Sequence, residues 1–277
     1  MSPPYRGAVR VPARSGSLPG RERDGRERDG PVVGGGVHDG GMVRRTTGAG
    51  AGGAGRGRAG ARVRAARRPE VRLPRLRAHD GRPLAPDGDF DSLEFDGADF
   101  TGQDGAGARF LDCALRTCVL DDVSLRGARV LDSVLTDVRG VGCDLAETTW
   151  RDAELAGFRL GGVQLYGAVL ERVHIRGGKI DYGNLRAARL RDVVFENCVL
   201  VEPDFSGARL ERVEFTDCAL TGVDFGAATL RDVDLRGAAP LRIARGADRL
   251  SGAVIGTAQL LDLAPVLAAE LGITVAD

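Results

Sequence analysis

Large apolar residues recur at every fifth position through the middle of this chain. Between Phe90 and Leu235 the series holds at 28 of 30 positions without a slip in register, and only Gly105 and Gly140 interrupt it. A period of five matches neither the 3.6-residue repeat of an amphipathic helix nor the two-residue repeat of an ordinary strand. The pattern therefore predicts a repeat architecture, with a bend or small loop at each of the two glycines.

A smaller residue precedes each large one by two positions, and a longer period of 20 residues is superimposed. Residues 107–126 align with residues 127–146, and residues 187–206 align with residues 207–226. Four fives thus make one coil with four short sides, in which the large and small residues point inward and the other three positions point outward. Stacked coils would pair their backbones at the strand spacing of about 4.8 Å and touch only their neighbours.

Several fives also share a polar residue just before the large one. Examples are GADF at 97–100, GCDL at 142–145 and VDF at 223–225. In this respect the chain resembles the pentapeptide-repeat proteins, whose usual five is A(D/N)Lxx. The resemblance implies an all-β solenoid, a right-handed quadrilateral β-helix, and the length of the repeat gives about 7–8 coils at four fives each. Arg109 and its equivalents replace the Asp or Asn on one side, which the fold tolerates because that position faces outward.

Composition divides the chain into four parts. Residues 1–70 are rich in Gly, Arg, Ala and Pro and predict a disordered tail, because such a segment buries little apolar area. Residues 71–86 form a lead-in that is expected to cap the first end of the repeat β-helix, residues 87–238. In residues 239–277 we expect a loop, a last repeat remnant and a short helical C-terminal cap, which Pro265 would split into two helices.

The residues that usually carry chemistry point to no active site. All five cysteines fall in the small inward position and are interpreted as core-filling residues: Cys113, Cys118, Cys143, Cys198 and Cys218. His174 faces outward without the partners of a catalytic triad or dyad. A straight rod also offers no cleft that would shift the pKa of a carboxyl. We therefore expect a protein that is not an enzyme and has no catalytic residue, metal or cofactor.

Charge is distributed unevenly, with a net +12 on residues 1–86 and a net −11 on residues 87–238. Outward residues 20 apart form columns along the rod. Two acidic columns make up the predicted interaction surface: Asp112, Asp132, Asp152, Asp192 and Asp232 in the first, and Asp144, Asp204 and Asp224 in the second. A third column is basic: Arg139, Arg159 and Lys179. The acidic rod is similar to the phosphate rows of DNA, although its charge is sparser than one per about 1.7 Å of axis.

These observations favour a non-enzymatic protein-interaction or scaffold module with an unknown partner. The family resemblance implies one alternative, a DNA mimic that binds DNA gyrase or another topoisomerase, since some family members bind gyrase and confer quinolone resistance. A second alternative is an enzyme-associated domain. The resemblance also implies a homodimer formed through the C-terminal cap. The basic tail could fold back on the acidic body, bind nucleic acid, or have no role.

Location follows from what the sequence lacks. No segment approaches the 18 consecutive apolar residues of a membrane span. The basic N-terminus has no apolar stretch of the kind found in a secretion signal. We therefore expect a cytoplasmic protein with no membrane partner, whose acidic repeat body does not bind nucleic acid directly.

Overall fold

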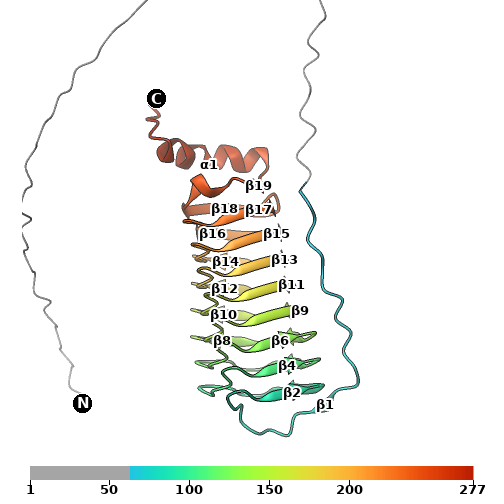
Figure 1. Cartoon of the computed structure of the whole chain (residues 1–277). Coiled ribbons are helices and arrows are strands. Elements are labelled where there is room, and N and C mark those ends of the chain that lie inside the picture. Colours follow the sequence, from blue (N-terminus) through green and yellow to red (C-terminus); the bar gives the residue numbers. More distant parts are fainter. Residues whose placement is uncertain (1–62, 277) are drawn as a thin grey trace, which may run out of the picture. The chain divides into compact units, whose positions relative to one another are not determined.

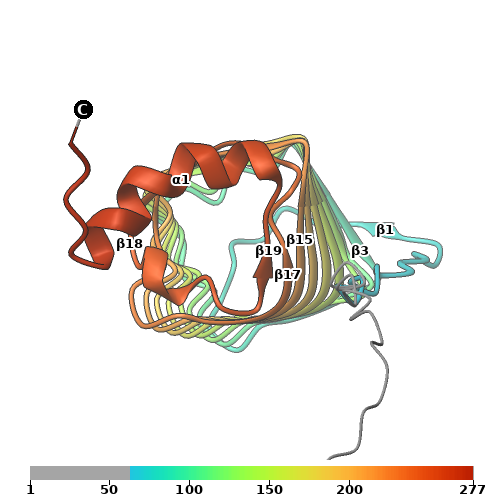
Figure 2. The ribbon, with the colours of Figure 1, turned by 90° about the horizontal axis from the view of Figure 1, so that it is seen from above.

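The five-residue period becomes a stack of short strands in the computed structural model, which describes residues 63–276. The coils form a parallel β-solenoid of about nine turns with one C-terminal helix (Figure 1). Seen along the stack, each coil has four sides (Figure 2). The predicted all-β solenoid is therefore confirmed, with about nine turns instead of the 7–8 coils expected. Of the tail predicted to be disordered, residues 1–70, the part from 1 to 62 lies outside the described residues. No helix among residues 63–276 is long and apolar enough to cross a membrane.

All strand pairs are parallel, and they form two sheets. The larger, 13-stranded sheet contains β1 (Arg77–Ala78), β2 (Asp89–Asp91), β3 (Leu93–Asp96), β4 (Arg109–Leu111), β5 (Ala114–Arg116), β6 (Arg129–Leu131), β7 (Val134–Thr136), β9 (Thr149–Ala156), β11 (Val169–Arg176), β13 (Arg189–Glu196), β15 (Arg209–Thr216), β17 (Thr229–Asp234) and β19 (Ala253–Val254). The smaller, 6-stranded sheet contains β8 (Arg139–Val141), β10 (Arg159–Gly161), β12 (Lys179–Asp181), β14 (Val199–Val201), β16 (Cys218–Asp224) and β18 (Ala238–Arg245).

The coil turns at a residue that adopts the left-handed conformation. Every fifth residue from Asp87 to Asp232 has a positive φ. Long strands such as β13 bend at such a residue, Asp192, and so contribute to a first and a second side of the coil. The smaller sheet forms the third side. Isolated bridges, for example between Asp144 and Gln164, hold the fourth.

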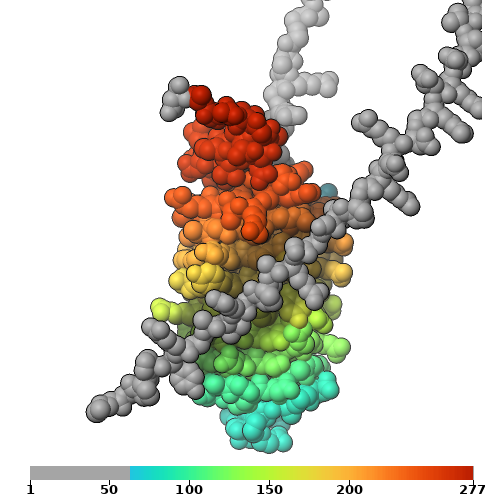
Figure 3. Space-filling model, turned by 90° about the vertical axis from the view of Figure 1, so that its left-hand side faces the viewer, coloured from blue at the N-terminus to red at the C-terminus, as the bar shows by residue number. Residues whose placement is uncertain are grey.

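Pairing in steps of 20 residues aligns identical positions of successive coils. Leu190 pairs with Leu210 in β13 and β15, and the rings of Phe195 and Phe215 stack with centroids 4.8 Å apart. The large inward residues of the middle coils are almost wholly buried. Each such side chain contributes about 1.5–3 kcal/mol to folding, so the inner columns hold the stack together. In the space-filling view the coils appear as successive bands of colour (Figure 3).

The two glycines that interrupt the apolar series do not bend the chain, so that prediction was wrong. Gly140 lies in β8 in register with Leu160. A Cβ at Gly140 would lie 2.5 Å from Cys143 Sγ, and a Cβ at Gly105 would lie 3.3 Å from the Leu84 side chain. Each glycine therefore leaves room for a neighbour in the core.

The first end of the solenoid is covered by residues that lead into it. β1 pairs with β3, and the His79 ring stacks on Phe95 with centroids 4.3 Å apart. Leu84 is buried in the core cluster. Burial lowers the pKa of His79 below its ordinary value, because the charged ring would lose hydration against the phenylalanine rings.

The C-terminal end differs from the prediction in two ways. The expected loop after residue 238 is instead strand β18, which pairs with β16 through a register shift that sets Leu220 opposite Leu241. The cap is one helix, α1 (Thr257–Glu270), with Pro265 inside it. Proline removes one backbone donor from a helix, but Leu263 and Val266 pack against the core and keep both halves in place. A short 3-10 helix, η1 (Ala247–Arg249), precedes α1.

A glutamine of α1 closes the end of the stack. The Gln259 side-chain amide donates hydrogen bonds to the carbonyl oxygens of Leu235 and Ala238, both at 2.6 Å. Its Oε1 accepts a bond from the backbone N–H of Gly256 at 2.7 Å. The cap thus supplies hydrogen-bond donors to carbonyl groups at the end of the last coil.

The inward and outward positions of one strand should differ sharply in their effect on stability. We expect Leu200→Ala, at a fully buried position of β14, to lower the free energy of unfolding by about 2–5 kcal/mol, because it leaves a cavity. Val199→Ala, on the adjacent outward position that is 41% exposed, should change it by about 0.5 kcal/mol or less. Chemical denaturation of the two variants checks this, and equal losses would contradict the assignment of the inner columns.

Candidate interaction surfaces

The first acidic column lies along the edge between the first and second sides. We call the outward residues from 112 to 232, in steps of 20, the corner column: Asp112, Asp132, Asp152, Arg172, Asp192, Arg212 and Asp232. All of them have a positive φ between 48° and 56°. Asp, like Asn, tolerates this left-handed conformation better than most residues with a side chain. The left-handed backbone conformation is therefore sufficient to explain why this column is rich in Asp, whether or not a partner binds there.

Arginines neutralise two aspartates in the middle of the corner column, Asp152 and Asp192. The guanidinium of Arg172 binds both carboxylate oxygens of Asp152, at 2.6 and 2.7 Å, and Arg212 binds those of Asp192 at 2.7 and 2.8 Å. The Asp192 side chain is only 3% exposed. The hydrogen bond from Arg212 lowers the pKa of Asp192 below its ordinary value, and the backbone N–H of Arg67 adds to the effect.

The lower part of the corner column keeps more of its negative charge. Asp112 and Asp132 make no ion pair within residues 63–276. Burial raises the pKa of Asp132, and the neighbouring charges of Asp152 and Asp112 raise it further. Together with Asp232 at the other end, Asp112 and Asp132 are the aspartates of the column that no arginine side chain of residues 63–276 compensates.

The second acidic column, Asp144, Asp204 and Asp224, has a structural role. Each side chain accepts a hydrogen bond from the backbone N–H two residues later: Ala146 at 3.1 Å, Ser206 at 2.8 Å and Gly226 at 2.7 Å. This arrangement is an Asx turn and fixes the corner of the coil. Ion pairs with Arg126, Arg186 and Arg245 further compensate their charges. The structure gives this column a structural role; its role as an interaction surface stays a prediction.

An N-terminal segment lies across the acidic second side. Residues 63–70, here called the strap, belong to the tail (residues 1–70) that was predicted to be disordered, but in the structure they are held against the solenoid by hydrogen bonds. The backbone N–H groups of Arg64, Ala66 and Arg67 donate to Asp232 at 3.4 Å, Glu214 at 2.7 Å and Asp192 at 3.1 Å respectively. The strap thus crosses β17, β15 and β13 roughly at right angles to the strands, as Figure 1 shows beside the stack.

The strap carries a pattern that the sequence interpretation missed. Val63, Ala66 and Pro69 are half-buried, whereas the residues between them are exposed. A three-residue spacing is typical of the polyproline II conformation, which has three residues per turn and no internal hydrogen bonds. The sequence does contain a signal for this conformation, because small apolar residues recur at this spacing between arginines. The composition of the surrounding Gly/Arg-rich sequence obscured it.

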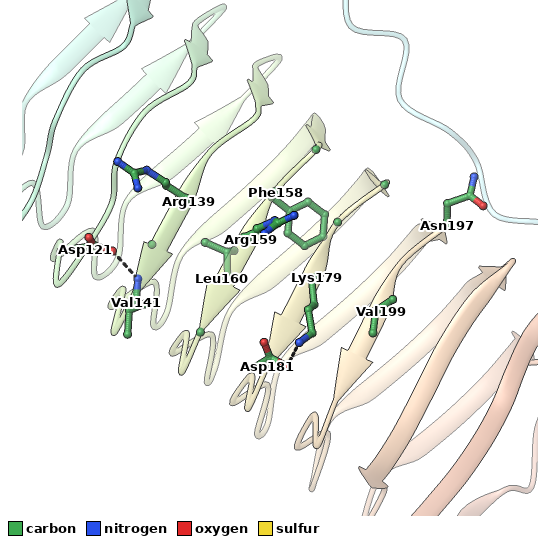
Figure 4. Close-up of a pocket in the computed structure, with 15 residues that line it drawn as sticks. Asp121, Arg139, Val141, Phe158, Arg159, Leu160, Lys179, Asp181, Asn197 and Val199 are labelled. Atoms are coloured by element: carbon green, nitrogen blue, oxygen red, sulfur yellow. Dashed lines mark hydrogen bonds and ion pairs between the residues drawn. The ribbon is translucent and has the colours of Figure 1, made fainter.

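A shallow hollow of about 910 Å³ opens on the third side, over β8, β10, β12 and β14 (Figure 4). Small residues form much of its floor: Gly157, Gly161, Gly177 and Gly178. The basic column runs through it. Lys179 pairs with Asp181 at 2.9 Å, whereas Arg139 and Arg159 have no carboxylate partner within 4 Å among the described residues.

Exposed apolar side chains gather on the same side of the coil. Within the described coils, the large apolar residues most exposed to solvent are Val141 (65%), Tyr182 (61%) and Val199 (41%). Val141 and Val199 line the hollow, and Tyr182 directly follows β12. Arginine and aromatic residues are enriched at protein interfaces relative to the remaining surface. The third side therefore combines exposed apolar groups with a basic row in which Arg139 and Arg159 have no carboxylate partner among residues 63–276. The sequence interpretation identified this side only as a basic column.

The cysteine prediction is confirmed. All five thiols are free and buried in the small inward position. Burial raises the pKa of Cys113 and of Cys143 to about 11. The thiolate is the reactive form of cysteine, so these residues act as core packing.

Comparison with known proteins identifies the repeat. A sequence model described as "Pentapeptide repeat region" matches residues 188–240. Solved structures similar to this chain include full-length QnrB1, a plasmid-mediated fluoroquinolone resistance protein, with 19% identity over 71% of this chain and 100% of that one, and a TM-score of 0.32. They also include HetL from Nostoc sp. strain PCC 7120, a pentapeptide repeat protein involved in heterocyst differentiation regulation, with 20% identity over 63% and 92% of the two chains, and a TM-score of 0.26. No curated protein matches the chain.

Contact between the strap and Asp192 should depend on pH. Because the pKa of Asp192 is lowered, its contribution to stability is complete above the ordinary pKa of about 3.9 and is lost as the pH falls through the lowered value. We expect the NMR shift of the Arg67 amide to stay constant from pH 6 to about 4 and to change only below the ordinary value. The Asp192→Asn variant should lack this step. A midpoint at or above the ordinary value would contradict the prediction.

Proposed function

We infer the function from the fact that the chain is a pentapeptide-repeat protein: we propose that it is a non-enzymatic binding scaffold that holds a protein partner on its third side. The observation that supports this most is that Arg139 and Arg159, which have no carboxylate partner among residues 63–276, lie in one hollow with the exposed Val141 and Val199. Their spacing is fixed by the coil, since residues of successive coils are about 4.8 Å apart.

The rigid backbone explains why such a surface suits binding. The middle strands of the third side pair with a strand on each side, as β10 does with β8 and β12. The end strand β8 pairs with β10 and is joined to the preceding coil by an isolated bridge between Arg139 and Val119. A surface that is already ordered loses little conformational entropy when a partner binds. The two unpaired guanidinium groups would attract a partner with acidic groups at matching spacing, and the apolar side chains would supply the buried area.

Binding to DNA gyrase through the acidic columns is the alternative that the family resemblance suggests. Asp112 and Asp132 favour it, because arginine does not compensate their charge. The rest of the acidic surface favours it less. Arg172 and Arg212 interrupt the corner column with bidentate ion pairs, and the second column carries the Asx turns. We therefore favour the third side as the binding surface.

An affinity-capture experiment, in which the tagged protein retains its partner from a lysate of the native cells, distinguishes the two surfaces. Tagged full-length protein should retain a specific partner that the double variant Arg139→Glu, Arg159→Glu loses by about tenfold or more, because charge reversal places repulsion at the contact. The matched variant Asp112→Asn, Asp132→Asn should retain it. Gyrase subunits are probed explicitly in each sample.

Two outcomes of this experiment are decisive against the proposal. If the aspartate variant loses the partner and the arginine variant keeps it, the acidic surface is the binding site. If gyrase is among the proteins lost, the partner is gyrase, as the alternative function states. If neither variant differs from the wild type, the third side has no part in binding.

We also propose that the chain forms a homodimer through α1. Leu261 is 70% exposed on this helix, and Leu271 (76%), Ile273 (56%) and Val275 (74%) follow it without cover. Contiguous exposed apolar groups of this kind usually mark an interaction site. The cap would thus close the solenoid with one face, through Gln259 and Leu263, and contact a second copy with the other.

Dimerisation should depend on the exposed face of the helix. We expect the wild type to sediment as a dimer at micromolar concentration and Leu261→Asp to sediment as a monomer, because a carboxylate would be desolvated in the interface. Val141→Asp provides the matched control, since Val141 is similarly exposed (65%) but lies on a coil. A wild type that is monomeric at every concentration would show that no such dimer forms.

A further inference from the structure

The second side of the solenoid has a group of polar residues that all contact the strap. Glu214 and Asp192 accept backbone N–H bonds from Ala66 and Arg67. The Arg68 guanidinium donates to Glu196 at 3.0 Å and lies 3.4 Å from the His174 ring nitrogen. Hydrogen bonds from Arg68 and from His174 lower the pKa of Glu196 below its ordinary value. Acidic groups on β13 and β15, together with a histidine on β11, therefore contact one short segment.

An apolar residue lies at the centre of this group. Val194 is on β13 between Asp192 and Glu196, and its partners on the neighbouring strands are His174 and Glu214. It occupies an outward position, yet it is 0% exposed. All four residues around it contact the strap, so the strap covers Val194. We call this arrangement of Val194, Asp192, Glu196, His174 and Glu214 the acidic groove.

The acidic groove recognises features that many peptides share. Two carboxylates accept main-chain N–H groups of adjacent residues, and this requires an extended backbone but no particular side chain at those positions. A third carboxylate, Glu196, accepts a guanidinium. Charge-assisted hydrogen bonds of this kind are about twice as strong as neutral ones. The chemistry therefore suits an extended segment that has free backbone N–H groups followed by an arginine.

We propose that the acidic groove is a peptide-binding site and that the strap is its tethered ligand. A partner protein with an extended, arginine-containing segment binds the same groove by displacing residues 63–70. The surface lies on the second side of the coil and is independent of the hollow on the third side. A tethered segment competes at an effective concentration of about millimolar, so the free peptide binds weakly while the strap is docked.

A proline substitution separates the main-chain contact from the charge. Ala66→Pro removes the N–H that Glu214 accepts, and an extended backbone is compatible with proline and with the residue before it. Ala65→Pro is the matched control, because Ala65 is exposed and its N–H makes no hydrogen bond within residues 63–276. Both variants keep every charge of the full-length chain.

The probe is a fluorescein-labelled peptide with the sequence of residues 63–70, VRAARRPE, and binding is followed by fluorescence anisotropy. We expect it to bind the Ala66→Pro protein about tenfold more tightly than the wild type or the Ala65→Pro protein, because the loss of a charge-assisted hydrogen bond weakens the competing strap by about that factor. Adding Glu214→Gln to the Ala66→Pro protein should reverse this gain. Affinity should also fall as salt is raised.

Three results would overturn the proposal: no binding of the peptide to the Ala66→Pro protein, equal binding to the Ala65→Pro and Ala66→Pro proteins, or a gain that persists with Glu214→Gln. Circular dichroism of each variant establishes that the solenoid is intact. A peptide carrying proline at the position of Ala66 gives a second measurement that needs no protein variant. It should bind the Ala66→Pro protein about tenfold more weakly than VRAARRPE, and equal affinity would also overturn the proposal.

Discussion

The structure depends on each coil closing in 20 residues, so that backbone pairing and side-chain stacking coincide. A coil one residue longer would move its inward side chains out of line with those of its neighbours. The left-handed residue at every fifth position provides this closure, since it turns the backbone by a similar amount at each corner. Where an extra residue does enter, before Leu241, the pairing of β18 with β16 shifts, and η1, β19 and α1 follow as the stack ends.

The same register determines the surface. Outward residues are brought to about 4.8 Å from their equivalents in the next coil, at which distance like charges in water repel by about 1 kcal/mol. Asp is favoured at the corner because it tolerates the left-handed backbone conformation there. A column made only of Asp would, however, place like charges next to one another in every pair of coils. Arg172 and Arg212 occupy that conformation at two coils and bind the Asp of the preceding coil. The charge pattern is therefore explained largely by the needs of the fold. Arg139 and Arg159, which make no ion pair within residues 63–276, are not explained in this way.

The periodicity predicted what depends on nearby or regularly spaced residues. It predicted the four-sided coil, the inward position of the cysteines and the presence of a helical cap, because a five-residue repeat and its end can be recognised without knowledge of contacts. It failed where a contact between distant residues decides the structure. Gly140 is required by Cys143 and Leu120, and the helix continues through Pro265 because its side chains pack on the last coil. The strap was missed for the same reason, since Arg67 meets Asp192 across 125 positions of sequence.

Those distant contacts also change how the solenoid is held together. In a stack of coils each unit touches only its neighbours, so its stability is approximately a sum of local terms and its ends can open separately. The strap connects coils that are not neighbours, because it contacts Asp232 near one end and continues to β1, which pairs with β3 at the other. Opening of the last coils must then also release a segment attached to the first. A docked strap therefore makes unfolding of the body more cooperative, and a partner that displaces it lowers that cooperativity as it binds.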